Sequence, residues 1–336
     1  MNLAEPVKGF PVVFSTGDPH GIGPEVILKA LSQFPTIHPI IFGDPHYLKE
    51  LRQDLGLSHD LDQVEVISSG HYNYPPAWGT LEEKAGRFAL QCLEAAVEYC
   101  RENRFPLLVT GPINKRATHL CGSTRPGQTE LVASFFPTAN PVMAFFSERL
   151  RVLLITVHIP LREVPLALHH DELVAKTEVF IEALRLIGIA QPRLALCGLN
   201  PHASEEGSFG DEERTILQPA VRTLNQKHGP ETVSGPFPAD TIFRRAVEHE
   251  FDGVIALYHD QGLIPLKLVA FESAVNVTLG LPLVRTSPDH GTAFDIAGQG
   301  VADARSMVQA IAWGIRLASA KPSPERVHRP VGKPEH

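Results

Sequence analysis

The 336-residue sequence predicts an α/β protein with two lobes, each with a mainly parallel sheet, around a central cleft. Short apolar runs typical of buried strands alternate with amphipathic segments along nearly the whole chain, and such alternation is typical of parallel sheets covered by helices. There are more strand-like runs than one small sheet would hold, and the chain is long enough for two domains.

Nine short apolar runs are predicted strands, and four longer amphipathic segments are predicted helices. The strands are residues 11–15, 38–43, 64–68, 105–111, 141–147, 151–157, 193–198, 253–258 and 274–280. The helices are residues 83–102, 171–188, 211–229 and 306–319. In the first helix Phe88, Cys92 and Tyr99 fall on one face at helical spacing. Gly229 is a stop signal for the third.

Composition excludes several classes of protein. The formal net charge of −8 argues against nucleic-acid binding, which calls for a basic face. No stretch approaches the roughly 18 apolar residues of a membrane span, and the first residues lack the pattern of a signal peptide. We therefore expect a cytoplasmic protein. The four cysteines form no C-x-x-C pair and are expected to be free thiols.

Three histidines, His158, His202 and His259, each stand at or just after the end of an apolar run. Ligands of α/β proteins usually bind at strand ends, and three imidazoles leave a divalent metal one position open for substrate. However, the chain has sixteen histidines, and separations of 44 and 57 residues match no local metal motif. From spacing alone, a metal site and three hydrogen-bonded structural histidines both stay open.

Two turns after predicted strands could bind an anion. Residues 15–26, STGDPHGIGPEV, form a glycine-rich turn before a helix, which suits phosphate binding and a plain tight turn about equally. In VTGPINK, Lys115 is expected near a helix start, where the helix dipole disfavours a cation unless an anion lies beside it. A solvated lysine is the alternative for Lys115.

The stretch from Tyr258 to Arg285 brings Lys267, Asn276 and Arg285 close to His259 in sequence, and we expect them on turns between apolar strands. Arg285 ends the apolar run GLPLV, where a cation usually has an anionic partner. That partner is either a structural carboxylate or a substrate phosphate.

The segment DHGTAFDIAGQGVAD, residues 289–303, resembles the adenine-side loop of the isocitrate and isopropylmalate dehydrogenase superfamily. The resemblance would place His290, Gly291 and Asp295 near a dinucleotide. With GDPHGIGPE, TGPINK, GQTE, GLNPHA, GPFPADT, YHDQGL and TLGLPLVRTSPDHGTA in this order, the chain resembles the 4-hydroxythreonine-4-phosphate dehydrogenase family from about Pro11 to Met307.

This resemblance implies an isocitrate dehydrogenase-like fold, with one domain at 1–135 plus 280–336 and another at 136–279. It implies oxidation and decarboxylation of a phosphorylated hydroxy amino acid with NAD or NADP and one divalent metal, zinc, magnesium, manganese or cobalt. It also implies a homodimer whose sites take residues from both subunits. The matching residues are His158, His202 and His259 for the metal, Gln128, Thr129, Lys267, Asn276 and Arg285 for the substrate, and Asp240 for proton transfer.

One departure affects the expected chemistry. Gln128 stands where the family has a histidine, and an amide cannot take up a proton at neutral pH. This leaves open a paralogue that oxidises threonate or erythronate 4-phosphate, or a dihydrodiol. A phosphate acyltransferase of similar fold is the alternative from another class, although the three histidines and the DIAG segment argue against it.

Overall fold

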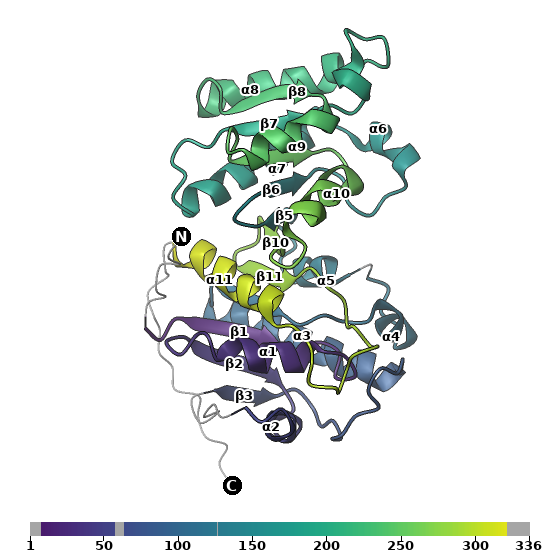
Figure 1. The fold of residues 1–336 in the computed structure, drawn as a ribbon, viewed down its shortest axis with the longest axis vertical. Coiled ribbons are helices and arrows are strands. Elements are labelled where there is room, and N and C mark those ends of the chain that lie inside the picture. The colour runs from purple at the N-terminus through teal and green to yellow at the C-terminus, as the bar shows by residue number, and fades with distance from the viewer. Residues whose placement is uncertain (1–7, 58–63, 126, 321–336) are drawn as a thin grey trace.

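The computed structural model describes residues 8–57, 64–125 and 127–320, and one 11-stranded sheet runs through the whole molecule. The strand order is β3-β2-β1-β4-β11-β10-β5-β6-β9-β7-β8. Figure 1 shows β1, β2 and β3 in the lower half, β6, β7 and β8 in the upper half, and β5, β10 and β11 between them.

The strands are β1 (Pro11–Ser15), β2 (His38–Gly43), β3 (Glu65–Ser68), β4 (Leu107–Thr110), β5 (Val142–Phe146), β6 (Arg151–Leu154), β7 (Leu194–Cys197), β8 (Val233–Phe237), β9 (Gly253–Ala256), β10 (Val275–Leu279) and β11 (Val284–Pro288). Pairing is parallel within β3-β2-β1-β4-β11 and within β6-β9-β7-β8. The three central pairs, β11-β10, β10-β5 and β5-β6, are antiparallel. The antiparallel strands therefore join two parallel halves.

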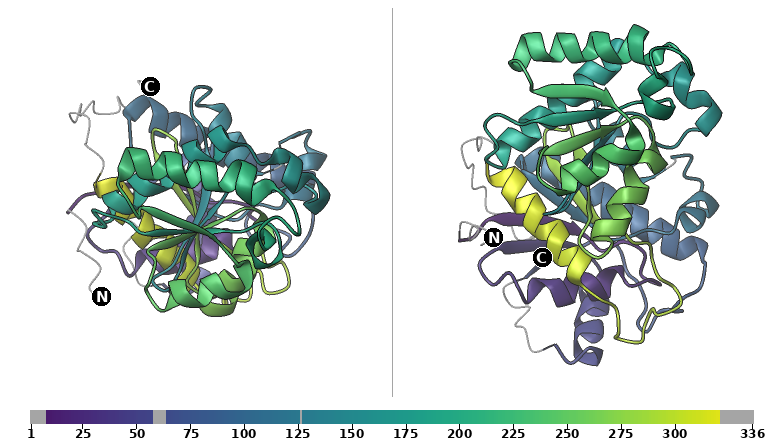
Figure 2. Two further views of the ribbon diagram at one scale, coloured as in Figure 1. Left: turned by 90° about the horizontal axis from the view of Figure 1, so that it is seen from above. Right: turned by 45° about the horizontal axis from the view of Figure 1, so that its top comes forward.

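Helices cover both faces of this sheet (Figure 2). They are α1 (Gly23–Leu31), α2 (Pro45–Asp54), α3 (Glu83–Asn103), α4 (Lys115–Leu120), α5 (Gln128–Ser134), α6 (Val164–Ala167), α7 (His170–Leu186), α8 (Gln218–His228), α9 (Ala239–Val247), α10 (His259–Ala270) and α11 (Arg305–Ser319). Short turns are η2 (Leu161–Glu163), η3 (Pro201–Ser204) and η4 (Glu213–Leu217), the last a single π-helical turn. No helix in the described part of the chain is both long and apolar enough to cross a membrane.

The α/β class and the mainly parallel pairing are confirmed, and each of the nine expected strands is present. The sheets of the two halves are continuous with each other, because β5 and β10 pair with each other and with the strands on either side. Two strands were missed. β8 and β11 contain proline and small polar residues, which are typical of turns in sequence. The proposed domain division stays a prediction.

The glycine-rich turn before α1 serves close backbone packing. An added Cβ at Gly21 would lie 2.8 Å from the carbonyl oxygen of Thr292, and one at Gly23 would lie 2.5 Å from that of Thr16. An added Cβ at Gly111, which follows β4, would lie 2.3 Å from the same carbonyl oxygen of Thr16. The turn before α1 and the turn after β4 therefore pack so closely against neighbouring backbone that only glycine is accommodated at these positions.

We predict that Gly111→Ala destabilises the fold by about 1–3 kcal/mol, because the new methyl group has to displace backbone rather than a flexible side chain. The matched control is Gly291→Ala, since its Cβ would have no neighbour within 4 Å and its backbone is not left-handed. The control should change the free energy of unfolding by less than about 1 kcal/mol. Urea unfolding of both variants measures this, and equal stability of the two would contradict the packing argument.

Candidate functional site

A cleft of about 330 Å³ lies at the antiparallel centre of the sheet. Its walls come from the turn after β4, the start of α5, the segment after β6, helix α10 and the segment after β11. The lining residues are Pro112, Ile113, Lys115, Gly127, Gln128, Thr129, Glu130, Met143, Phe145, His158, His259, Leu263, Lys267, Asn276, Arg285, Ser287, Pro288, Asp289, His290 and Gly291.

The floor of the cleft is one face of the central strands. Asn276 on β10 is directly opposite both Phe145 on β5 and Ser287 on β11. Because side chains alternate between faces along a strand, Arg285 lies on the same face as Ser287. Continuous antiparallel pairing thus brings an amide, a hydroxyl and a guanidinium to one surface, although they come from separate segments of sequence.

Arg285 is almost completely buried in a central strand, with 3% of its surface exposed. Its guanidinium donates to the Thr110 hydroxyl at 2.7 Å and 3.1 Å, and to Gln128 Oε1 at 3.2 Å. No carboxylate of the described residues lies within ion-pair distance of it. Burial lowers the pKa of Arg285 to about 10, although Glu130 acts in the opposite direction. The group still carries its charge at neutral pH, and a buried charge without a counterion requires an anion.

The cleft is cationic within an acidic protein. Its lining contains three permanent cations, Lys115, Lys267 and Arg285, against two carboxylates, Glu130 and Asp289. The whole chain carries a formal charge of −8. Lys267 Nζ lies 3.2 Å from Asp289 Oδ2, so one cation is partly neutralised. Even so, the balance favours an anionic ligand.

Two of the three predicted metal ligands lie together. The ring centroids of His158 and His259 are 6.0 Å apart, and both rings line the cleft. His259 Nδ1 is 2.7 Å from Asp260 Oδ1, and His158 Nδ1 is 3.8 Å from Glu130 Oε1. Carboxylates that hold Nδ1 leave Nε2 available for a cation, as is common for metal-binding histidines.

His202 is not in the cleft. It lies exposed in η3, and no group of three His, Cys, Asp or Glu side chains among residues 8–57, 64–125 and 127–320 could hold a metal ion. Asp240 is exposed in the first turn of α9 and does not line the cleft either. The cleft therefore contains two of the three expected imidazoles and does not contain the expected aspartate.

The remaining predicted residues divide in the same way. Gln128 and Thr129 line the cleft from the first turn of α5, and His290 and Gly291 line it after β11. Asp295 is exposed and outside the cleft, with its carbonyl oxygen accepting from Gln299. The structure therefore brings all five substrate-binding candidates together, but only two of the three dinucleotide-binding candidates.

Three expectations about local structure were wrong. Lys267 lies inside α10, and Asn276 and Arg285 lie inside β10 and β11, rather than on turns. Asn276 and Arg285 face the cleft, so the sheet tolerates them even though they interrupt apolar sequence. Lys115 begins α4 and lines the cleft with its side chain exposed, so the anion-binding lysine and the solvated lysine both stay predictions.

The sequence argument gave no separate role to Glu130 and Asp289. Glu130 directly follows Thr129, and its Oε2 is buried without a hydrogen-bond partner. The nearby imidazole of His158 lowers the pKa of Glu130, whereas burial raises that of Asp289. Asn276 Oδ1 and His290 Nε2 are also buried without partners at the cleft. Unsatisfied acceptors beside an unpaired guanidinium suit a ligand that carries both donor groups and negative charge.

Comparisons with known proteins found relatives that match most of this chain. A sequence model of the family described as "Pyridoxal phosphate biosynthetic protein PdxA" matches residues 35–314. The 4-hydroxythreonine-4-phosphate dehydrogenase of Desulfosudis oleivorans is 39% identical over 90% of this chain and 94% of its own. The D-threonate 4-phosphate dehydrogenase of Salmonella typhimurium is 38% identical over 91% of this chain and 98% of its own.

Solved structures show the same relationship. The crystal structure of 4-hydroxythreonine-4-phosphate dehydrogenase from Klebsiella pneumoniae has a TM-score of 0.79 and 37% identity, covering 92% of this chain and 98% of its own. A branched-chain phosphotransacylase from Enterococcus faecalis has a TM-score of 0.55 and 13% identity, covering 91% of this chain and 99% of its own. At that identity the second comparison shows a shared fold alone.

We predict that Arg285→Met weakens the binding of inorganic phosphate at least 10-fold, since a hydrogen bond to a charged group contributes about 1.5–3 kcal/mol. Methionine fills the buried space without the charge. The matched control is Arg101→Met, which removes an exposed arginine of α3 that pairs with Glu98. Titration calorimetry measures both variants, and unchanged affinity in Arg285→Met would remove this residue from the anion site.

Proposed function

Because the chain belongs to the PdxA family of pyridoxal phosphate biosynthetic proteins, we propose that it is a 4-hydroxythreonine-4-phosphate dehydrogenase. It would oxidise the substrate's secondary alcohol with NAD or NADP and release carbon dioxide, giving 3-amino-2-oxopropyl phosphate. The observation that carries this proposal is the buried guanidinium of Arg285, which has no carboxylate partner in the described chain and faces the cleft. The choice between NAD and NADP and a cytoplasmic location stay predictions.

The phosphate group would be held by Arg285, Lys267, Thr129 and Asn276. A guanidinium presents several donors in fixed geometry, and Thr110 and Gln128 already hold that of Arg285 in place. A rigid anchor of this kind fixes the distance from the phosphate to the reacting carbon, which converts binding energy into orientation. A hydroxy acid without phosphate would leave this charge unpaired and would bind poorly.

The end of the substrate opposite its phosphate would lie against the buried acceptor atoms of the cleft that have no hydrogen-bond partner. Glu130 Oε2 is buried at the cleft without a partner. An ammonium or hydroxyl group of the substrate would satisfy it, and an apolar group would not. A ligand with phosphate at one end and amino and hydroxyl groups at the other therefore complements both sets of side chains.

The divalent metal would be held by His158, His259 and His202 of the partner subunit. When bound, such a metal polarises the hydroxyl that loses its proton and stabilises negative charge as carbon dioxide leaves. Glu130 and Asp260 would orient the two imidazoles of the cleft through Nδ1. Three imidazoles favour zinc or another transition metal over magnesium.

Asp240, the proposed proton acceptor, would come from the same partner subunit as the third histidine. Helix α9, which carries Asp240, packs against η3, which carries His202. One approach by a second subunit would therefore bring both side chains to the cleft. Homodimer formation is thus part of the proposed mechanism, because the cleft is incomplete without it.

His290, Gly291 and Asp295 would bind the dinucleotide. His290 Nδ1 is 2.9 Å from the Gly291 carbonyl oxygen, and its Nε2 is buried without a partner beside the cleft. An added Cβ at Gly291 would meet nothing within 4 Å, so there is open space beside this segment. Asp295 lies further along the same segment and would contact a part of the dinucleotide outside the cleft.

A second candidate is the oxidation of D-threonate 4-phosphate, the substrate in the name of the Salmonella relative. The observation in its favour is Gln128, where the family has a histidine. Gln128 Oε1 accepts from Arg285 and its Nε2 donates to the Gly111 carbonyl oxygen. Its amide is thus used to position Arg285 and cannot exchange a proton with the amino group that distinguishes the two substrates.

We predict production of NADH or NADPH from 4-hydroxythreonine 4-phosphate by the purified chain with a divalent metal, and its loss when the metal is chelated. The assay compares this substrate with D-threonate 4-phosphate, erythronate 4-phosphate and unphosphorylated 4-hydroxythreonine. A kcat/KM at least 10-fold higher for D-threonate 4-phosphate would establish the second candidate. If none of the phosphorylated substrates yields NADH or NADPH, the proposal is wrong.

We also predict that mixed dimers show which imidazoles of one metal site come from the same subunit and which comes from the partner. His202→Ala and His259→Ala homodimers should each be inactive, but a mixture refolded together should regain up to half of the activity in its hybrid dimers. One hybrid cleft then has all three imidazoles. The control is a mixture of His158→Ala with His259→Ala, which should stay inactive because each hybrid cleft lacks one imidazole. Activity in the control mixture, or no activity in the first mixture, would contradict the assignment of His202 to the partner subunit.

A further inference from the structure

A segment without helix or strand connects β11 to α11 and carries the three candidate dinucleotide-binding residues. Residues 289–304 form no regular element, and Asp295 is exposed near their middle. Loops of this kind move more than the elements they connect unless other parts of the protein hold them. A mobile loop loses entropy when it orders around a ligand, so the contacts that hold it beforehand raise the affinity for that ligand.

The glycine-rich turn before α1 holds the end of this segment that is nearer to the cleft. The backbone N–H of Ile22 donates to the carbonyl oxygen of Thr292 at 3.0 Å. An added Cβ at Gly21 would lie 2.9 Å from the Cβ of Thr292, so a side chain there would push the turn and the segment apart. The segment is therefore bound to the turn directly after His290 and Gly291, which line the cleft.

A largely buried ion pair on α1 holds the other end of the segment. Lys29 Nζ lies 2.6 Å from Glu25 Oε1, and Glu25 has 2% of its surface exposed. The same Glu25 oxygen accepts from the backbone N–H of Ala302 at 2.9 Å. Lys29 Nζ donates to the carbonyl oxygens of Gly300 at 2.8 Å and Ala302 at 3.0 Å. The pair therefore makes three hydrogen bonds to the backbone of the segment, from a helix that is distant in sequence.

The middle of the segment packs against the loop that precedes α3. An added Cβ at Gly298 would lie 2.5 Å from the ring of Trp78, and one at Gly79 would lie 2.5 Å from the carbonyl oxygen of Phe294. The backbone N–H of Gly79 also donates to the carbonyl oxygen of His20 at 3.0 Å. The loop before α3 is thus bound to the glycine-rich turn as well, and together they support the segment along its length.

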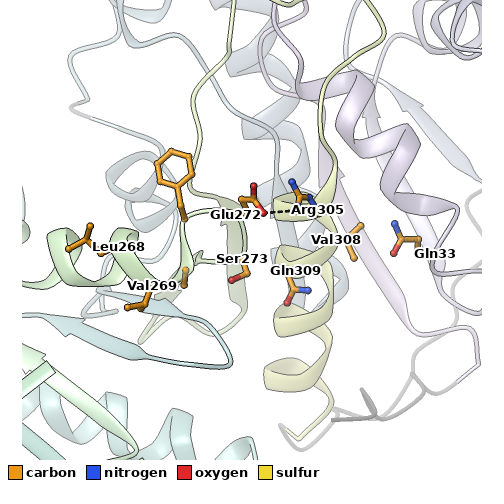
Figure 3. A pocket seen from close by; sticks show the side chains of 10 residues that line it. Gln33, Leu268, Val269, Glu272, Ser273, Arg305, Val308 and Gln309 are labelled. Atoms are coloured by element: carbon orange, nitrogen blue, oxygen red, sulfur yellow. Dashed lines mark hydrogen bonds and ion pairs between the residues drawn. The ribbon is translucent and has the colours of Figure 1, made fainter. Parts of the chain in front are cut away.

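An exposed ion pair just beyond the segment provides a comparison with the buried one. Arg305, the first residue of α11, pairs with Glu272 at 2.5 Å beside a hollow of about 490 Å³ (Figure 3). Both side chains of this pair are 62% exposed. Exposed ion pairs contribute little to stability, whereas charges in a less polar environment interact more strongly. We therefore expect the segment to depend on Glu25 and Lys29 rather than on Arg305.

We propose that Glu25 and Lys29 are positioning residues, which hold residues 292–302 in the conformation that binds the dinucleotide. The proposal rests on the proposed function for the identity of the ligand, whereas the contacts that support it do not. It also gives the glycine-rich turn a role other than phosphate binding. The Glu25 carboxylate lies in the first turn of α1, where it occupies the helix N-terminus that would otherwise attract an anion.

The test compares two ligand affinities of the full-length Lys29→Met variant with those of the wild-type chain. Methionine keeps the stem of the side chain and removes both hydrogen bonds to carbonyl oxygens. The dissociation constant for NADH or NADPH, measured by cofactor fluorescence, should rise about 10-fold or more. The dissociation constant for inorganic phosphate, measured by titration calorimetry, should change less than about 2-fold, because Arg285 lies outside the segment. A general loss of structure would weaken both ligands alike.

The matched control is Arg305→Met, which removes the exposed ion pair with Glu272 just beyond the segment. Both dissociation constants of this control should stay within about 2-fold of the wild-type values. The double variant Glu25→Gln, Lys29→Met serves if Lys29→Met does not fold, since it leaves no buried charge unpaired. Glutamine can still accept from the Ala302 N–H, so this variant should show the same selective loss of cofactor affinity.

Hydrogen exchange without any ligand separates this proposal from the proposed function. Backbone amides of residues 292–302 should exchange faster in Lys29→Met than in the wild-type chain and in Arg305→Met. Unchanged exchange there, or an equal loss of affinity for cofactor and phosphate, would overturn the positioning role. If the wild-type chain binds neither NADH nor NADPH, the proposed function fails, whereas faster exchange in Lys29→Met would still support the part of the proposal that concerns the segment.

Discussion

The constraint on which the site depends is the burial of a guanidinium in the middle of a continuous sheet. Arg285 is on β11, flanked by β4 and β10, with neutral hydrogen-bond partners alone among the described residues. A charge in this position destabilises the empty protein and is compensated when an anion binds. Thr110 and Gln128 accept hydrogen bonds from this side chain, so the protein itself holds the guanidinium at the cleft.

The same sheet explains why polar residues from separate segments converge. Antiparallel pairing of β5, β10 and β11 between two parallel halves creates a surface where alternate side chains of three strands face the cleft. Parallel strands with helices on both faces would be apolar throughout at this position. The change from parallel to antiparallel pairing therefore determines where a polar ligand can bind in an otherwise apolar sheet.

A second feature of the molecule is the separation of its expected metal ligands. His158 and His259 are neighbours, but His202 is presented elsewhere by a rigid left-handed loop. Packing of α9 on η3 places Asp240 near that loop rather than near the cleft. The chain thus carries two of the three candidate imidazoles in the cationic cleft and the third in an acidic loop away from it.

The sequence by itself determined the α/β class, the strands with continuous apolar runs and the candidate histidines, and it predicted an anionic partner for Arg285. It could do so because strand burial, helical periodicity and the cost of a buried charge are local properties. Only the tertiary structure decided that the two halves share one sheet, that β8 and β11 are strands, and that His202 and Asp240 lie outside the cleft. Those outcomes depend on pairing and packing between residues far apart in sequence, which no local pattern encodes.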